Sequence, residues 1–159
     1  MMKLKFFSRL IMVFILTLTI TGCNTSDDKA GKITAGAEWS KIGSTSTGDT
    51  YYSKNSIKEV RDNVFLIQTK AIYSDGGKKE KFLFLKSIDS APDNSEMLSH
   101  ELRLWHVDCA ANKINPFSST IYNTENNIIV SSPEFPDKWD DILPNSLASE
   151  LKNIVCPAK

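Results

Sequence analysis

The side chains best suited to chemistry are His106 and Asp108, which share one face of a predicted strand, and His100 shortly before them. A catalytic triad would also need an activated nucleophile with oxyanion donors. A zinc site would need three or four convergent ligands. The sequence contains no Gly-x-Ser-x-Gly, no His-Glu-x-x-His and no phosphate-binding loop. We therefore predict no catalytic residue, no metal site and no enzymatic activity, and interpret the histidines as ordinary surface or half-buried side chains.

Three other polar segments also have a simpler interpretation than chemistry. Residues 44–47 are hydroxyl-rich, but a hydroxyl nucleophile needs a base beside it. Residues 78–81 (Lys-Lys-Glu-Lys) are predicted to form a solvated hairpin tip, with contact to anionic lipid or acidic polysaccharide as the alternative. Asp137, Asp140 and Asp141 lack the spacing of a calcium loop. Ligand-binding residues therefore remain unknown at this stage.

The first residues are typical of an exported lipoprotein. A basic stretch precedes an apolar core that is too short to cross a bilayer, which takes roughly 20 apolar residues. The core ends in Ile20-Thr21-Gly22-Cys23, which resembles the lipobox of bacterial lipoproteins. That resemblance implies cleavage between Gly22 and Cys23, and diacylglycerol with further acylation on Cys23. The alternative is an ordinary secretory signal in which this cysteine is incidental.

The lipobox divides the chain into three parts. Residues 1–22 are the predicted signal peptide, residues 23–36 a polar lipidated tether, and residues 37–159 the folded domain. Lipid on Cys23 would be the membrane anchor, and no other cofactor is expected. Asn24 follows the cysteine, whereas aspartate there is the usual inner-membrane retention signal in enteric-type bacteria. We therefore expect the cell envelope, and the outer membrane within it.

The charge of the chain disfavours a nucleic-acid partner. The whole sequence has no net charge, but the three charged residues before Cys23 are all basic. The mature chain is therefore acidic overall, and it has no basic stripe that could follow a phosphate backbone.

Two cysteines, Cys109 and Cys156, remain after lipidation of Cys23. In an oxidising compartment such a pair predicts a disulfide. A reduced buried pair and half of a metal site are the alternatives, although two thiolates alone do not complete a zinc shell.

Alternation of apolar and polar residues predicts an antiparallel sheet of about six strands. The clearest strand candidates are residues 37–42, 49–53, 63–74, 101–109, 113–122 and 127–131. In the strand 101–109, a period of two puts Trp105, Val107 and Cys109 on one face. Trp39, Trp105 and Trp139 are expected to fill the core and the sheet edges, in preference to binding sugar.

Residues 74–77 (Ser-Asp-Gly-Gly) predict a hairpin turn, because aspartate and glycine tolerate positive φ angles. Residues 80–88 are then the return strand, apolar on both faces through Phe82-Leu83-Phe84-Leu85 and expected to be buried.

A single helix is predicted, at the end of the chain. Ser146 is its expected N-cap, and Glu150 places negative charge in the first turn. An apolar stripe follows at helical spacing, and Pro157 ends the helix. The stripe consists of Leu147, Leu151, Ile154 and Val155. The fold class is therefore α+β, with a C-terminal helix that a Cys109–Cys156 disulfide would tether to the face of the sheet carrying Trp105.

These features together resemble the surface-adhesin protein E family over roughly residues 37–156. The resemblance rests on Trp39, Tyr51-Tyr52 before Ile57, Asp108-Cys109, Trp139 and Ile142 before Pro144-Asn145-Ser146, and Val155-Cys156. It implies an antiparallel sheet whose concave face holds a C-terminal helix through the same cysteine pair. The family pattern often has aspartate after the aromatic pair, where this chain has Ser53-Lys54.

The resemblance also implies a function. It indicates an outer-membrane lipoprotein that contacts host matrix and plasma proteins, and it allows a homodimer. No adhesive motif of the family is identifiable, so no binding residue is transferred. The alternative function is an envelope accessory lipoprotein that faces the periplasm and binds another envelope component.

Overall fold

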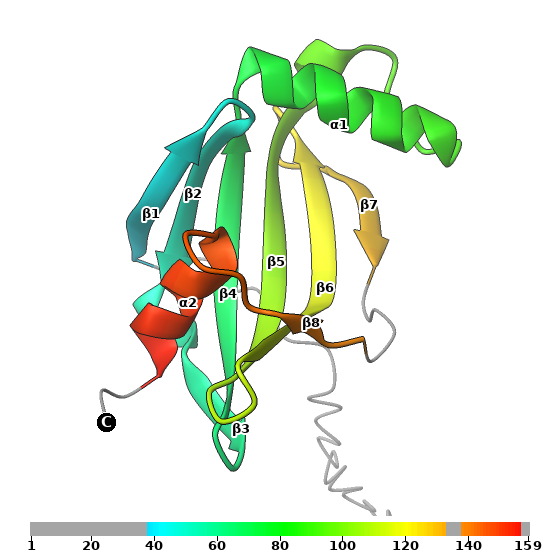
Figure 1. The fold of residues 1–159 in the computed structure, drawn as a ribbon. Coiled ribbons are helices and arrows are strands. Elements are labelled where there is room, and N and C mark those ends of the chain that lie inside the picture. The colour runs from blue at the N-terminus through cyan, green and yellow to red at the C-terminus, as the bar shows by residue number, and fades with distance from the viewer. Residues whose placement is uncertain (1–37, 133–137, 157–159) are drawn as a thin grey trace, which may run out of the picture.

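An antiparallel sheet with two helices on one of its faces forms the described part of the chain (Figure 1). The computed structural model describes residues 38–132 and 138–156. The predicted signal peptide and the whole of the tether, with Gly22, Cys23 and Asn24, lie outside the described residues, as does Asp137.

The sheet has eight strands, of which six follow one another in the order β1-β2-β4-β5-β6-β7. β3 pairs with β4, and β8 pairs with β6. The strand bounds are Trp39–Thr45 (β1), Gly48–Ser53 (β2), Lys58–Arg61 (β3), Val64–Tyr73 (β4), Leu98–Asp108 (β5), Lys113–Asn123 (β6), Ile128–Ser132 (β7) and Asp140–Asp141 (β8). Two short 3₁₀ turns are also present, at Lys54–Ser56 and Ser95–Met97. The predicted antiparallel sheet is confirmed, and the two strands beyond the predicted number are both short.

The two faces of the central strands differ in what they carry. We define the helix face as the side of the sheet on which Ile67 of β4 and Val107 of β5 lie. β4 and β5 are paired so that Ile67 is opposite Trp105 and Thr69 is opposite Arg103. Alternation therefore places Glu101, Arg103, Trp105 and Val107 in one row along the helix face.

The C-terminal helix α2, Leu147–Val155, packs on this face as predicted. Leu151 and Val155 are buried against Ile67 and Val107 in the main core cluster. The Ser146 hydroxyl caps the helix by accepting from the Ser149 amide at 3.2 Å. Leu147, the first residue of the predicted stripe, remains 39% exposed.

The disulfide between Cys109 and Cys156 joins the residue after β5 to the residue after α2. The two Cα atoms are 5.7 Å apart, within the usual range for a disulfide. Both cysteines pack against the main core cluster, on the same side as Trp105. The tethered helix predicted from the sequence is therefore confirmed.

The predicted hairpin at residues 74–88 is wrong, because this segment forms a second helix, α1, Asp75–Ser87. Ser74 is its N-cap, and its hydroxyl accepts from the Gly77 amide at 3.1 Å. The Ser-Asp-Gly-Gly sequence thus begins a helix and does not form a hairpin turn between two strands. In the helix Leu85 is fully buried, whereas Leu83 and Phe84 are exposed.

The start of α1 is held against the β1–β2 turn. The Ser74 amide donates to the Thr47 carbonyl at 3.0 Å, and the Ser74 hydroxyl donates to the Ser46 carbonyl at 2.6 Å. A Cβ atom on Gly77 would lie only 1.9 Å from the Thr47 carbonyl oxygen. Glycine is therefore required here by the close approach of two backbones.

α1 forms its own smaller core at the other end of the helix face. Leu85 packs against Leu98 of β5 and Ile121 of β6 in a cluster separate from that of α2. Figure 1 shows α1 lying across one end of the sheet, while α2 covers the strands further along. The two helices thus leave an uncovered part of the helix face between them.

Candidate functional site

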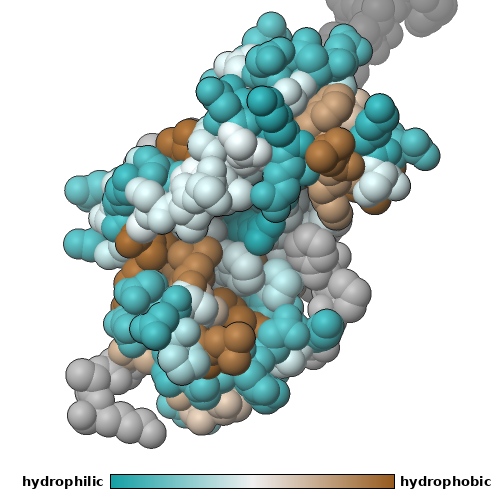
Figure 2. Space-filling view, turned by 45° about the horizontal axis from the view of Figure 1, so that its top comes forward, coloured by the Kyte–Doolittle hydropathy of each residue, from teal (hydrophilic) through white to brown (hydrophobic). Residues whose placement is uncertain are grey.

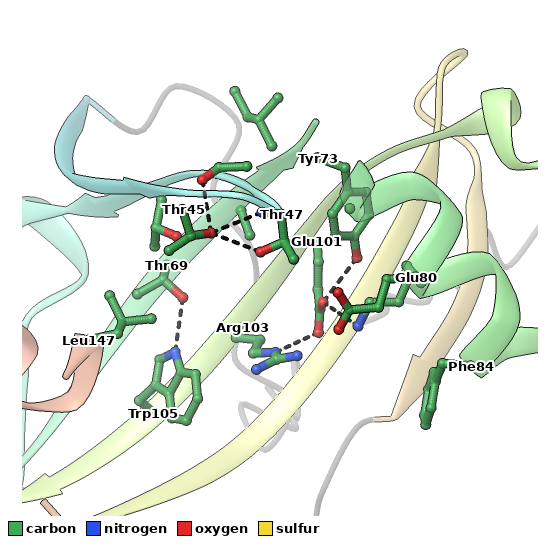
Figure 3. A pocket seen from close by; sticks show the side chains of 16 residues that line it. Thr45, Thr47, Thr69, Tyr73, Glu80, Phe84, Glu101, Arg103, Trp105 and Leu147 are labelled. Atoms are coloured by element: carbon green, nitrogen blue, oxygen red, sulfur yellow. Dashed lines mark hydrogen bonds and ion pairs between the residues drawn. The ribbon is translucent and has the colours of Figure 1, made fainter. Parts of the chain in front are cut away.

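A cleft of about 360 Å³ occupies this uncovered part of the helix face (Figure 3). The volume is in the range of small-ligand sites. β4 and β5 contribute its floor, while α1, α2 and the β1–β2 turn supply residues around it. The floor includes Thr69, Glu101, Arg103 and Trp105.

The Glu101 carboxylate accepts from four donors. Tyr73 donates its hydroxyl to Oε2 at 3.0 Å, and the Lys81 ammonium lies 3.0 Å from the same oxygen. The Arg103 Nε and the Ser119 hydroxyl both donate to Oε1, each at 2.5 Å. The Glu101 side chain is only 4% exposed, so its charge depends on these partners for stabilisation.

The cluster fixes the protonation states of Glu101 and Tyr73. Burial alone would raise the pKa of Glu101, but the charge and hydrogen bond of Arg103, with Lys81 and Ser119, lower it to about 2. Burial and the neighbouring Glu101 raise the pKa of Tyr73 far above its usual value. Glu101 is therefore ionised and Tyr73 neutral at physiological pH. Because the carboxylate is already saturated with donors, the cluster is suited to holding charges in place and poorly suited to proton transfer.

Arg103 connects this cluster to Trp105. Its guanidinium carbon lies 5.5 Å from the centroid of the indole ring, a cation–π distance. The indole N–H in turn donates to the Thr69 hydroxyl at 2.9 Å. Figure 3 shows the guanidinium between the indole and the Glu101 carboxylate. Of the three guanidinium nitrogens of Arg103, only Nε has a hydrogen-bond acceptor among the described residues. Both terminal nitrogens are therefore available to a ligand.

The walls of the cleft combine apolar and hydroxyl groups. Phe84 of α1 and Leu147 of α2 are both among its lining residues and are 53% and 39% exposed. Thr45 and Thr47 line it from the β1–β2 turn, where their hydroxyls are 2.8 Å apart. Glu80 of α1 adds a negative charge to the lining. The cleft therefore offers charged, hydrogen-bonding and apolar surfaces to one ligand.

The three residues considered first for chemistry are not brought together in a site. His100 is on the opposite face from Glu101, because the two are neighbours on one strand. It stacks on Tyr122 with ring centroids 4.8 Å apart, and burial and the nearby Lys70 lower its pKa. His106 lies near Phe117, with ring centroids 4.7 Å apart, and six residues along a strand separate it from His100. The described residues contain no group of three potential metal ligands.

Asp108 has a structural role in the turn after β5. Its carboxylate accepts from the backbone amides of Ala110 and Ala111, at 3.0 and 2.7 Å. Such a side chain stabilises a tight turn and leaves the aspartate without a catalytic geometry.

Asp140 and Asp141, considered for calcium, form β8, where Asp141 pairs with Lys113 at 3.0 Å. Of the three tryptophans, Trp39 lies 6.0 Å from the Lys70 ammonium, and Trp139 lies beneath Arg61 at 5.4 Å. Only Trp105 lines the cleft.

The interpretation of residues 78–81 as a solvated tip is wrong for Lys81. These residues belong to α1, and the Lys81 side chain is only 18% exposed because it reaches Glu101. Glu101 and Arg103 were not predicted from the sequence as site residues. A signal existed, because these two charged residues share a strand face with Trp105, which was expected to fill the core or a sheet edge.

The fold defines the class of this protein as a small α+β domain in which a disulfide holds a C-terminal helix on an antiparallel sheet. The model of the surface-adhesin protein E family matches residues 39–157, which is most of the chain. The chain therefore belongs to that family, and it is an adhesin-like surface protein. No curated protein and no solved structure shows significant similarity to it. None of its helices, within the described ranges, has the length and apolar character needed to cross a membrane.

Proposed function

We propose that this protein is a non-enzymatic outer-membrane lipoprotein that binds extracellular or host matrix proteins through its helix face. Family membership supports the adhesin-like role. The lipobox ending in Cys23 supports a lipid anchor, and a polar stretch of chain separates that anchor from the domain.

The observation that carries the proposal is the exposure of large hydrophobic side chains on and next to the two helices, of which Phe84 and Leu147 line the cleft. Leu83, Phe84 and Ile88 of the α1 region are 66%, 53% and 48% exposed. Leu143 and Leu147, before and within α2, are 66% and 39% exposed. Figure 2 shows hydrophobic patches among hydrophilic side chains on a view that includes this side. Apolar groups kept in solvent around a concavity are typical of protein interaction surfaces.

Solid-phase binding to purified matrix glycoproteins tests the proposal. The mature chain carrying Cys23→Ser, which removes the lipid, should bind at least one of them saturably. Leu83→Ser combined with Phe84→Ser should weaken that binding by about tenfold or more, since buried aromatic and aliphatic anchors dominate interface energies. Val60→Ser, at a 44% exposed residue of β3, is the matched control and should have no effect. An absence of saturable binding to every glycoprotein would contradict the adhesive role.

Anchoring and orientation need separate measurements. Radiolabelled palmitate should label the wild-type protein in cells and should not label Cys23→Ala. Protease added to intact cells should degrade a surface-exposed domain. Protection of the domain until the outer membrane is opened would favour the alternative, an accessory lipoprotein that faces the periplasm.

A further inference from the structure

The terminal nitrogens of Arg103 are donors in the cleft that have no acceptor among the described residues. Arginine presents its five N–H groups in a planar fork that matches a carboxylate with two parallel hydrogen bonds. Within the described part of the chain, only Nε has an acceptor, which is Glu101. The Arg103 side chain is 37% exposed and lines the cleft, so its remaining donors can reach a bound group.

The position of this arginine is fixed before any ligand arrives. Glu101 holds one edge of the guanidinium, and Tyr73 and Lys81 hold Glu101. Trp105 supports the guanidinium, and Thr69 fixes the indole. A ligand therefore meets a group that has already lost its rotational freedom, which removes much of the entropic cost of binding.

The charges of the cleft favour a singly charged ligand. Lys81 and Arg103 are balanced by Glu80 and Glu101, so the lining has no charge excess that would hold a doubly charged phosphate. Glu80 has no ion-pair partner among the described residues, and it would repel an anion. A carboxylate adds one negative charge, whereas a dianion would add two beside that glutamate.

The apolar part of the lining indicates what accompanies the carboxylate. Phe84 and Leu147 are exposed and lie in the lining with Trp105. We propose that the cleft binds a carboxylate flanked by an aromatic or apolar side chain. This inference rests on the proposed function, because the bound partner protein would supply that group from an acidic side chain or a chain terminus.

The simplest probe is N-acetyl-L-phenylalanine, compared with its uncharged amide. Titration of the mature chain carrying Cys23→Ser should move the Trp105 indole N–H resonance saturably with the acid. The affinity for the amide should be lower than that for the acid by about tenfold or more. This is the loss expected when one or more charge-assisted hydrogen bonds are removed. Inorganic phosphate at the same concentrations should bind more weakly than the acid. Equal binding of acid and amide, or tighter binding of phosphate, would refute the proposal.

Arg103→Gln should weaken binding of the acid by about tenfold or more. The matched control is Arg61→Gln, because Arg61 also lies over a tryptophan but is on β3, away from the cleft lining. Glu80→Gln should tighten binding several-fold by removing the repulsive charge. If circular dichroism shows that Arg103→Gln does not fold, Glu80→Gln and the comparison of acid with amide still decide the question. Unchanged binding in both cleft variants would overturn it.

Peptides separate the two sources of the carboxylate. One peptide ends in a free C-terminal phenylalanine, and a second has an amidated end and an internal Asp-Phe pair. Binding of only one identifies the source, and binding of neither refutes a protein partner for the cleft.

If the acid binds but no matrix glycoprotein does, the cleft is confirmed and the adhesive function fails. If glycoproteins bind equally well to wild type and Arg103→Gln, the function stands and the cleft is not its site.

Discussion

Replacing Glu101 by glutamine should lower the free energy of unfolding by about 3 kcal/mol at pH 7. The pKa of this carboxyl is lowered from 4.5 to about 2 in the folded protein. Each unit of that difference corresponds to about 1.4 kcal/mol of preference for the ionised form, and the group is almost fully buried. Glutamine has a similar shape but no charge, so Lys81 and Arg103 lose their common partner.

The pH dependence of this effect has a definite sign. A lowered folded-state pKa stabilises the protein above pH 4.5, and this stabilisation is lost as the pH falls toward 2. Less than half of the contribution of about 3 kcal/mol should therefore remain at pH 3. The difference in stability between wild type and Glu101→Gln should shrink by about 2 kcal/mol between pH 7 and pH 3.

Urea denaturation, followed by circular dichroism at pH 7, 5, 4 and 3 with the disulfide intact, measures this difference. Glu80→Gln is the control, because Glu80 lines the same cleft but, among the described residues, makes no hydrogen bond or ion pair with the Glu101 cluster. Its stability difference from wild type should stay nearly constant over the same range. Parallel pH profiles for wild type and Glu101→Gln would show that Glu101 is not held ionised by its neighbours, and would refute the reasoning.

Three further predictions concern the fold. Replacing Cys109 and Cys156 together by alanine should cost about 4 kcal/mol on the chain-entropy model, seen as a lower urea midpoint than that of the oxidised protein. Leu151→Ala should cost about 2–5 kcal/mol, because the side chain is fully buried; a loss below about 1 kcal/mol would show that α2 packs loosely. Gly77→Ala should destabilise the start of α1, since its Cβ would clash with the Thr47 carbonyl, and faster amide exchange confined to α1 and the β1–β2 turn would show it.

The helix that the sequence predicted and the helix that it did not differ in their local signals. α2 has Ser146 as a cap and an apolar stripe, and both are independent of the rest of the fold. The Asp75-Gly76-Gly77 stretch after Ser74, by contrast, suits either a hairpin or a helix start. The close contact between Gly77 and Thr47 favours the helix. This contact joins residues 30 positions apart, so the local sequence pattern does not indicate it.

The cleft could be predicted only in part for the same reason. The period of two along β5 correctly places Trp105 on the helix face, and it also places Glu101 and Arg103 there. Burial of a charged residue becomes interpretable only when its partners are known. Lys81 reaches Glu101 from α1, and Ser119 reaches it from β6, so both contacts depend on tertiary structure.

The covalent link between Cys109 and Cys156 also has a consequence for a domain exposed to proteases. Residues 124–127, the turn between β6 and β7, are exposed and lie within the loop that this bond closes. A single cut in that turn would therefore leave two pieces still joined through sulfur, and the C-terminal piece would remain attached to the N-terminal one. Such nicked material would migrate as one band on a non-reducing gel and as two after reduction.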